Sequence, residues 1–340
     1  MLPLEEEGTF LDFSDLLTGY RLSEALMRAH DAGVFEAVGQ EGCEGLALCA
    51  KVGWEPVYGD RFLRCLCGLG LLKRHGSWYS LSRFAAIYLY SASAQYQGKT
   101  LAFEQKLQQS WQRLPATLAS GKRINTNNKN PLELRQAFVT YLGAMDEAAR
   151  IRAIELWGAI QVPAATGTIL DIGAGAGTFL LHFLSKHPGW RAIFCDLPEV
   201  VANAELHQQL AGMPTSRLDW CACNLLDDGP SAFDAIGDQS CDLVLLSNII
   251  HCQGTAETEM LLRKAVAKTA EQGLLIIHDF FSDTGWRGAL YDIHMMIHTY
   301  NGKTYSLQEI IELAAHSGFC HSVSEQLPSG STALILSRKS

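Results

Sequence analysis

The sequence predicts an α/β protein in which a doubly wound parallel sheet, covered by helices on both faces, follows a smaller and mostly α-helical domain. Two observations support this fold class. The chain has 340 residues, which exceeds the usual size of a single hydrophobic core and favours two domains. From Thr168 onward, fully apolar β-rich segments alternate with helical patterns, as is typical of parallel strands buried on both faces.

The N-terminal region has the pattern of short helices followed by a pair of strands. Residues 16–38 carry apolar side chains at helical spacing, and Gly39 is a helix stop signal. Residues 60–70 predict a further helix, and two short strands follow around Gly76. This order of elements resembles a winged-helix unit, and we assign residues 1–95 to it.

Long helical patterns occupy residues 96–161, interrupted by a polar turn at Gly121–Pro131. We expect these helices to connect the two domains and to cover the active site. The remaining segment, residues 162–340, is the predicted α/β domain. Its expected strands are residues 168–174, 191–198, 218–226, 241–250, 273–281 and 331–339.

Composition favours a small-molecule partner. The formal net charge is -9 and the sequence pI is about 5.7, and no run of Lys and Arg supplies the basic face that nucleic acid or an anionic membrane requires. The helix at residues 60–70 has only two arginines, so we expect it to pack against another protein chain rather than DNA. No segment has the roughly 20 apolar residues of a membrane-spanning helix, and the N-terminus is acidic, so a cytoplasmic location is predicted.

Ten cysteines are present, and we expect them to be reduced thiols. Two close pairs, Cys65 with Cys67 and Cys221 with Cys223, have CxC rather than CxxC spacing. We interpret them as small buried apolar residues, neither disulfide-bonded nor bound to a structural zinc ion.

The glycine-rich turn that follows the first predicted strand of the α/β domain indicates an adenosine cofactor. Gly173, Gly175 and Gly177 allow a ligand to approach the backbone closely. A dinucleotide fingerprint would require a small residue where Thr178 stands, whereas Gly177 gives GxGxG directly after Asp171. S-adenosyl-L-methionine has no phosphate but carries an amino group and a sulfonium, which suits an acidic residue at Asp171. The spacing therefore favours this methyl donor.

Asp196 ends the second strand of the domain, 25 residues after Asp171. A carboxylate there offers two acceptor oxygens to the two hydroxyls of a ribose. Because NAD enzymes and adenosylmethionine enzymes share this feature, it supports the adenosine site without choosing between the two cofactors.

Four successive motifs carry a resemblance that covers nearly the whole chain. They read LDIGAGAGTFLLHFLSKHPGWRAIFCDLPEVV, LVLLSNIIHC, GLLIIHDFF and MMIHTYNGKTYSLQEI. Together they resemble the two-domain small-molecule O-methyltransferases, which include hydroxyindole, caffeic-acid and bacterial polyketide enzymes. The resemblance implies a Rossmann-like catalytic domain, a homodimer formed through the winged-helix domain, and S-adenosyl-L-homocysteine as the coproduct.

The resemblance also implies a catalytic pair. His251 follows a predicted strand and matches the family's general base, although Cys252 and Gln253 replace the residues that usually follow it. Asp279 matches the acidic residue that orients this histidine. The family's second acidic residue is missing, because the corresponding stretch runs from Lys303 to Tyr305 without a carboxylate.

Further contacts follow from position and resemblance. The expected cofactor contacts beyond the glycine turn and its two aspartates are Leu197, Asn224, Leu225, Ser247 and Asn248. The expected acceptor contacts are Met145, Tyr291, His294, Met295 and His298. The acceptor is expected to be aromatic or conjugated.

Other interpretations remain open at this stage. His294 and His298 lie at i and i+4 on one predicted helix face, near His278 in sequence, but no acid lies between them as in an HExxH metal helix. We therefore assign no metal. Transfer to N, S or C, a non-methylating reaction such as decarboxylation or rearrangement, and a winged-helix transcriptional regulator are the alternative functions.

Overall fold

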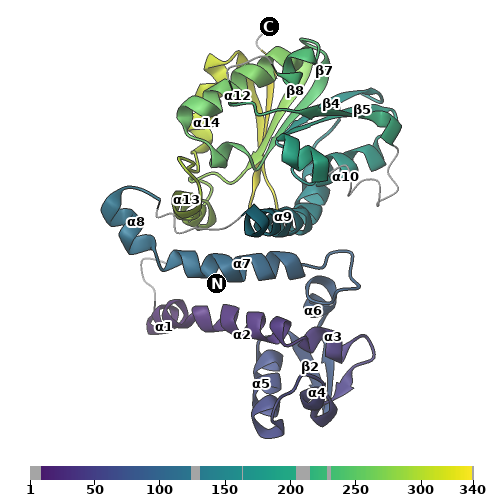
Figure 1. Ribbon diagram of the computed structural model, residues 1–340, viewed down its shortest axis with the longest axis vertical. Coiled ribbons are helices and arrows are strands. Elements are labelled where there is room, and N and C mark those ends of the chain that lie inside the picture. The colour runs from purple at the N-terminus through teal and green to yellow at the C-terminus, as the bar shows by residue number, and fades with distance from the viewer. Residues whose placement is uncertain (1–8, 124–130, 163, 204–214, 228–230, 339–340) are drawn as a thin grey trace. The chain divides into compact units, whose positions relative to one another are not determined.

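The computed structural model describes residues 9–123, 131–162, 164–203, 215–227 and 231–338 (Figure 1). The chain divides into two compact units, Met1–Lys106 and Leu107–Ser340. The predicted turn at Gly121–Pro131 lies mostly outside the described residues. We describe each unit separately.

The first unit contains the predicted helix and strand pair. Its β1-β3-β2 sheet is antiparallel, and its core contains Phe35, Leu48, Leu63 and Tyr79. The expected helix at residues 16–38 is instead divided among three helices, with breaks at Gly19 and at Ala32–Gly33. The second break follows from Gly33, which adopts a φ of 71° and interrupts the helical hydrogen bonds. The elements are α1 (Phe10–Thr18), α2 (Tyr20–Asp31), α3 (Val34–Val38), β1 (Cys43–Glu44), α4 (Gly45–Lys51), α5 (Pro56–Gly68), β2 (Leu72–His75), β3 (Trp78–Leu81), α6 (Arg83–Tyr88) and α7 (Gly98–Trp111).

The second unit is built on a seven-stranded sheet in the order β6-β5-β4-β7-β8-β10-β9. This arrangement confirms the predicted α/β fold class. The strands are β4 (Gly167–Ile172), β5 (Trp190–Asp196), β6 (Leu218–Ala222), β7 (Cys241–Ser247), β8 (Thr269–Asp279), β9 (Phe319–Gln326) and β10 (Thr332–Arg338). The helices are α8 (Leu114–Ser120), α9 (Pro131–Ala159), α10 (Thr178–Lys186), α12 (Thr255–Lys268), α13 (Trp286–His298) and α14 (Leu307–His316), with short 3-10 turns η1 (Thr215–Arg217), η2 (Ala232–Ala235) and η3 (Ile250–Cys252).

The sheet is mixed rather than wholly parallel. β10 pairs antiparallel with both β8 and β9, and β9 has no counterpart among the strands expected from the sequence. The short turn from Leu327 to Ser331, closed by a 2.8 Å backbone hydrogen bond, leaves no room for a crossover. Strands joined by so short a connection pair antiparallel.

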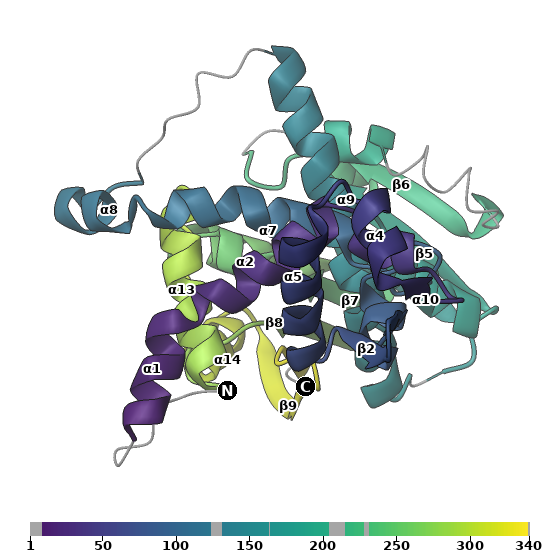
Figure 2. The same ribbon diagram turned by 90° about the horizontal axis from the view of Figure 1, so that it is seen from below.

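Helices cover both faces of the sheet, and a separate hydrophobic core lies on each face. Figure 2 shows α10 and α14 on opposite sides of β7 and β8. One core includes Phe183 and Trp190 beneath α9 and α10, and the other includes Leu261 and Ile310 from α12 and α14. With both faces buried, ligands can reach the sheet only at the ends of its strands.

The carboxyl ends of four neighbouring parallel strands meet at one edge. β5, β4, β7 and β8 lie side by side, and Asp171, Asp196, Ser247 and Asp279 stand at or next to the ends of these strands. The register pairs Asp171 with Leu245 and Ser247 with His278. Residues distant in the sequence are thereby placed along one edge.

None of the described helices combines the length and apolar character that crossing a membrane requires.

Helix α13 approaches the chain before it so closely that only glycine fits at position 288. A Cβ built on Gly288 would lie 1.8 Å from the carbonyl oxygen of Phe281, whereas one on Gly158 of α9 meets no described atom within 4 Å. We expect Gly288→Ala to lower the free energy of unfolding by about 1–3 kcal/mol and Gly158→Ala to raise it by about 0.5–1 kcal/mol. Urea unfolding of both variants measures the two changes in the free energy of unfolding. Equal changes would contradict the close approach of α13 to Phe281.

Candidate active site

The glycine turn between β4 and α10 has the backbone geometry of a close ligand contact. Gly173, Gly175 and Gly177 have φ values of 76°, 58° and 74°, which side-chain-bearing residues rarely adopt. A Cβ on Gly173 would lie 2.8 Å from Cδ1 of Ile249, but one on Gly175 would meet nothing within 4 Å among the described atoms. The turn therefore packs against the segment before His251 and leaves open space at Gly175.

Asp171 presents a carboxyl group that lacks a partner. The residue is buried, and neither carboxyl oxygen has a hydrogen-bond partner within the described part of the chain. Burial, together with the charge of Asp196, raises the pKa of Asp171 well above its usual value. A cationic ligand would provide the missing partner. The amino group of S-adenosylmethionine fits this requirement.

Asp196 is oriented by the backbone of its own turn. One carboxylate oxygen accepts the amide of Gly175 at 2.7 Å, and the other accepts the amide of Leu197 at 2.7 Å. Burial raises the pKa of Asp196 despite these hydrogen bonds. Because a carboxylate oxygen can accept two hydrogen bonds, each retains capacity for a ribose hydroxyl.

Two of the expected cofactor contacts, Asn224 and Leu225, lie in a turn after β6. The side chain of Asn224 bonds locally: its oxygen accepts the amide of Leu226 at 3.1 Å, and its amide donates to Asp227 at 2.9 Å. Leu225 is buried, and its carbonyl oxygen accepts a hydrogen bond from Lys264. Asn224 is therefore tied to the turn itself, and Leu225 supplies an apolar surface.

His251 and Asp279 form a buried ion pair. Nδ1 of His251, in η3, lies 2.5 Å from Oδ1 of Asp279, at the end of β8. The same oxygen accepts the amide of Phe280 at 2.8 Å. The carboxylate therefore accepts a hydrogen bond from Nδ1–H, which leaves Nε2 of the neutral imidazole as the nitrogen with a free lone pair. Nε2 lies 3.4 Å from the hydroxyl of Tyr291.

The pair also sets the charge of the imidazole. Burial by itself lowers the pKa of His251, but the charge of Asp279, the hydrogen bond to it and the nearby Tyr291 and Cys252 together outweigh burial and raise the pKa well above the usual histidine value. The imidazolium is thus the stable form below that pKa, and the neutral imidazole predominates only above it.

Aromatic rings continue from His251 along α13. The ring of Tyr291 lies edge-on to His251 at 5.0 Å and stacks on His294 at 5.5 Å. Trp111 follows at 6.2 Å from His294, and Phe280 lies 4.7 Å from Tyr291. These contacts form a continuous series of aromatic rings beside His251.

The two histidines of α13 are neutral. Burial lowers the pKa of His294 to about 4, and it lowers the pKa of His298 as well. Nδ1 of His298 donates to the carbonyl oxygen of His294 at 2.8 Å. Met295 is buried, and Met145 lies half-buried on α9.

Ser247 and Asn248 form part of an internal hydrogen-bond chain. The hydroxyl of Ser247 lies 2.8 Å from Nδ1 of His278 and accepts the side-chain amide of Asn248 at 3.0 Å. Nε2 of His278 lies 2.8 Å from the hydroxyl of Ser331. Burial lowers the pKa of His278 to about 3. His278 is thus a neutral structural residue that fixes the end of β7 against β8.

The structure accounts for the stretch that lacks the expected carboxylate. The hydroxyl of Tyr305 donates to the carbonyl oxygen of Gln253 at 3.0 Å, and Lys303 pairs with Glu309 at 3.0 Å. This stretch therefore supports the turn that carries His251.

Sequence reasoning missed Tyr141, Trp111 and Phe280. Tyr141 on α9 interacts electrostatically with His251 and Asp196, and desolvation of its hydroxyl raises its pKa although 41% of the residue is exposed. An aromatic residue four positions before Met145 on a helix shares its face, and this signal could have identified Tyr141. Trp111 and Phe280 carry no comparable signal, because their positions depend on tertiary packing.

Within the described residues, one group of three metal-ligating side chains lies close together, Cys195, Cys221 and Cys223, and the histidines form no such group. The close approach of Cys195 to the CxC pair was not expected from the sequence.

Two family models match the chain. One, described as an O-methyltransferase domain, matches residues 131–320. The other, described as an O-methyltransferase dimerisation domain, matches residues 14–91.

Curated relatives and solved structures are similar over almost the full length. The 3-hydroxy-5-methyl-1-naphthoate 3-O-methyltransferase of Streptomyces sahachiroi is 24% identical over 314 residues, which cover 90% of this chain and 88% of that protein. Acetylserotonin O-methyltransferase of Bos taurus is 24% identical over 359 residues, covering 100% of both. The crystal structure of human N-acetylserotonin methyltransferase in complex with SAM has a TM-score of 0.82 at 18% identity and covers 100% of both chains, a likeness of fold.

Because the carboxyl of Asp171 lacks a hydrogen-bond partner among the described residues, we predict that Asp171→Asn raises the stability of the ligand-free protein but weakens cofactor binding. The raised pKa of this carboxyl means that its contribution to stability is present at acid pH and is lost as the pH rises through the folded-state value. Asp171→Asn should therefore stabilise the ligand-free protein increasingly as the pH rises. It should also weaken S-adenosylhomocysteine binding about tenfold to a hundredfold, since a hydrogen bond to a charged group contributes about 1.5–3 kcal/mol.

Thermal unfolding across pH and calorimetric titration measure the two effects. Asp219→Asn is the matched control, because Asp219 is an exposed strand aspartate paired with Arg191. A ligand-free Asp171→Asn protein that is less stable than wild type at neutral pH would contradict the assignment.

Proposed function

Because the chain belongs to the O-methyltransferase family and is an S-adenosylmethionine-dependent methyltransferase, we propose that it methylates a hydroxyl group of a small aromatic or conjugated acceptor, with His251 as the general base. The observation that carries this proposal is the buried pair of His251 and Asp279 beside the glycine turn. A phenol with a pKa near 10 is mostly protonated at neutral pH, so its methylation benefits from a base.

The proposed mechanism assigns a separate task to each residue. S-adenosylmethionine, when bound, supplies an electrophilic methyl group on a sulfonium. Asp171 holds its amino group, Asp196 holds its ribose hydroxyls, and Gly175 gives the backbone close access. Nε2 of His251 accepts the acceptor's hydroxyl proton, while Asp279 stabilises the resulting imidazolium and fixes its orientation.

The acceptor class follows from the series of aromatic rings. Tyr291, His294 and Trp111 form consecutive ring contacts that begin at His251, and flat rings bind well to aromatic side chains. We assign Met145, Met295 and His298 to the same acceptor site. Within residues 96–161, the part on α9 that carries Tyr141 and Met145 then covers this site.

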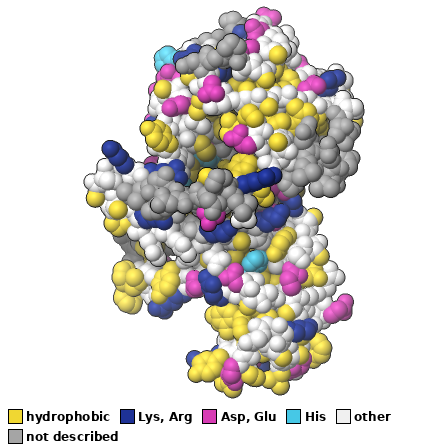
Figure 3. Space-filling view, viewed as in Figure 1, with side chains coloured by type: hydrophobic (Ala, Val, Ile, Leu, Met, Phe, Trp, Pro, Cys, Tyr) yellow, Lys and Arg dark blue, Asp and Glu magenta, His cyan; other side chains and the backbone are white. Residues whose placement is uncertain are grey.

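The dimerisation domain supports a homodimer as the working form. Helix α1 has no buried residue, and its large apolar side chains are exposed, including Phe10 at 81%, Leu11 at 68%, Phe13 at 54%, Leu16 at 53% and Leu17 at 64%. Figure 3 shows apolar side chains gathered in the region of this helix. An apolar surface of this kind is typical of an interface with another chain. The acidic net charge of -9 favours a protein partner over nucleic acid.

Removing the base should abolish most of the turnover. We expect wild type to form S-adenosylhomocysteine in equal amount with an O-methylated product, and His251→Ala to lower kcat about 10²- to 10⁴-fold with little change in cofactor affinity. Product and coproduct are quantified together by mass spectrometry over a panel of phenols. His316→Ala is the control, since His316 is exposed on α14. Turnover without S-adenosylhomocysteine would instead indicate a non-methylating reaction.

The pH dependence separates a base from a merely structural histidine. Because neutral His251 is the active form and Asp279 raises its pKa, kcat/KM should rise with pH through a midpoint above the usual histidine value of about 6.5. In Asp279→Asn the midpoint should move to lower pH while kcat falls. An acid limb that does not move in Asp279→Asn would remove His251 as the base.

Charges placed on α1 should separate the dimer. We expect Phe13→Asp combined with Leu17→Asp to convert a dimer into a folded monomer, because a charge on a buried interface is strongly unfavourable. Sedimentation equilibrium measures the mass, and circular dichroism checks the fold. Val323→Asp, at a half-exposed position on β9, is the control. A double variant that stays dimeric would exclude α1 from the interface.

A further inference from the structure

Strand pairing gathers three thiols on one face of the sheet. Cys195 on β5 and Cys221 on β6 are register partners in the parallel ladder, so their side chains point to the same face. Cys223 follows Cys221 by two residues and therefore returns to that face. The amide of Cys223 donates to the carbonyl oxygen of Asp196 at 2.9 Å, which continues the pairing beyond the end of β6.

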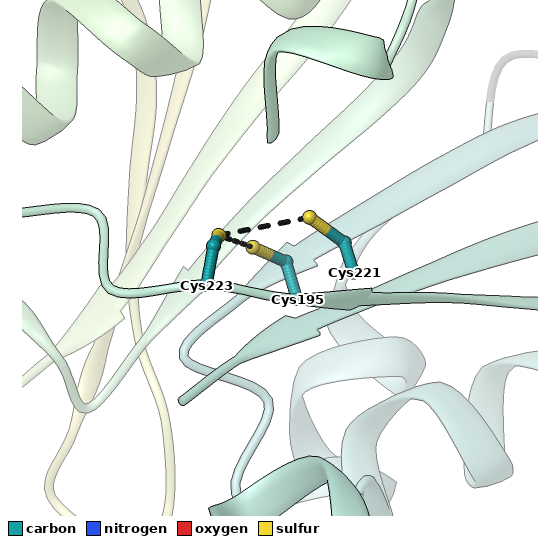
Figure 4. Close-up of side chains that lie close together, drawn as sticks. All are labelled: Cys195, Cys221 and Cys223. Atoms are coloured by element: carbon teal, nitrogen blue, oxygen red, sulfur yellow. Dashed lines mark hydrogen bonds between the residues drawn. The ribbon is translucent and has the colours of Figure 1, made fainter. Parts of the chain in front are cut away.

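The three sulfur atoms lie close together in a buried apolar site (Figure 4). The sulfur of Cys223 is 3.6 Å from that of Cys195 and 3.6 Å from that of Cys221, and all three lie within 4.8 Å of one another. The cluster belongs to the core that also contains Leu225 and Phe233. Across the described residues, no fourth cysteine, histidine or carboxylate joins the group.

We propose that Cys195, Cys221 and Cys223 form a three-thiolate site for a soft monovalent metal ion, with Cu(I) as its ligand. Thiolates select soft ions such as Cu(I). Metal–sulfur bonds of about 2.3 Å place three sulfurs about 4 Å apart around a trigonal ion, close to the spacing observed. Zn²⁺ in a structural site takes four ligands, and only three are present here among the described residues.

The same spacing disfavours a disulfide as the function of the cluster. A disulfide requires sulfurs about 2.05 Å apart, so Cys223 would have to move well over 1 Å from its 3.6 Å separation toward either neighbour. Ion binding requires almost no movement. Each ligating thiol loses its proton to solvent, and copper enters and remains as Cu(I), so no electron is transferred.

Two positively polarised groups face the cluster. The backbone of Phe233 hydrogen-bonds to the thiol of Cys223, and the charge of Lys264 acts on the same sulfur. Lys264 is held in place by the carbonyl oxygen of Leu225. Both groups offset part of the negative charge that three thiolates around a monovalent ion would carry.

The site lies directly behind the cofactor-binding edge. The carbonyl oxygen of Cys195 accepts the amides of Gly173 at 2.8 Å and Ala174 at 3.3 Å. The amide of Cys223 is bonded to Asp196, as described above. An ion held by these cysteines therefore links β6 to β5 next to the point where β5 contacts the glycine turn.

The test is copper binding by the intact protein under anaerobic conditions. Cu(I) is supplied in competition with a chromogenic Cu(I) chelator, and retained copper is measured for wild type, Cys195→Ala and Cys223→Ala. We expect wild type to retain a single tightly held ion. Each variant should bind it about a hundredfold more weakly or worse, because the free energy of thiolate metal sites is shared among few ligands. Wild type should also gain thermal stability with the ion.

The matched control is Cys65→Ser combined with Cys67→Ser, which removes the other CxC pair. These residues lie on α5, where positions i and i+2 point in different directions, so this variant should retain the ion like wild type. X-ray absorption of the wild-type complex should show three sulfur neighbours and needs no variant to fold.

Three results would overturn the proposal. They are equal copper affinity in wild type and both cluster variants, a sulfur count other than three, and tight Zn²⁺ binding at the cluster in preference to Cu(I). Any of them would mean that the three thiols do not form the soft-metal site inferred here, and none depends on whether the methyl-transfer proposal holds.

Discussion

The register of four parallel strands is the constraint on which the rest of the molecule depends. β5, β4, β7 and β8 are adjacent and run in the same direction, so the polar residues at their ends reach a common edge. Asp171, Asp196 and Asp279 come from three different strands, and a shift of one residue in any pairing would turn its aspartate to the opposite face. The buried cores on both sides of the sheet hold that register.

The two buried carboxyl groups at this edge, those of Asp279 and Asp171, differ in their interaction partners. Asp279 has His251 within 2.5 Å and forms a pair with its opposite charge inside the protein. Asp171 has no such partner among the described residues, and its raised pKa reflects a group that the fold alone leaves unsatisfied. One oxygen of the first carboxyl, Oδ1 of Asp279, is already held by His251 and the amide of Phe280, whereas neither oxygen of Asp171 has a hydrogen-bond partner within the described part of the chain. Stability and binding therefore make opposite demands on Asp171.

The sequence predicted those features that depend on local pattern. Strand ends, the glycine turn and the position of His251 follow from short segments, and the α/β class follows from their order. The antiparallel β9 and β10, the ring contact of Trp111 with His294 and the approach of Cys195 to Cys221 depend on which strands and helices become neighbours. The sequence pattern of one strand does not show which strand lies beside it. The pair Cys221 and Cys223 therefore gave no indication that Cys195 lies next to them.

The absence of a second carboxylate beside the base has a structural explanation. In its place, Tyr305 donates a hydrogen bond to the carbonyl oxygen of Gln253, and a Cβ on Gly302 would lie 2.4 Å from the carbonyl oxygen of His251. The segment thus packs directly behind the base and holds its backbone in place. Because His251 and Asp279 are both buried, where charges interact more strongly than in water, we propose that a single carboxylate is sufficient to hold the imidazolium. In this proposal, the burial of the His251–Asp279 pair and the packing of the segment behind it take the place of the second carboxylate.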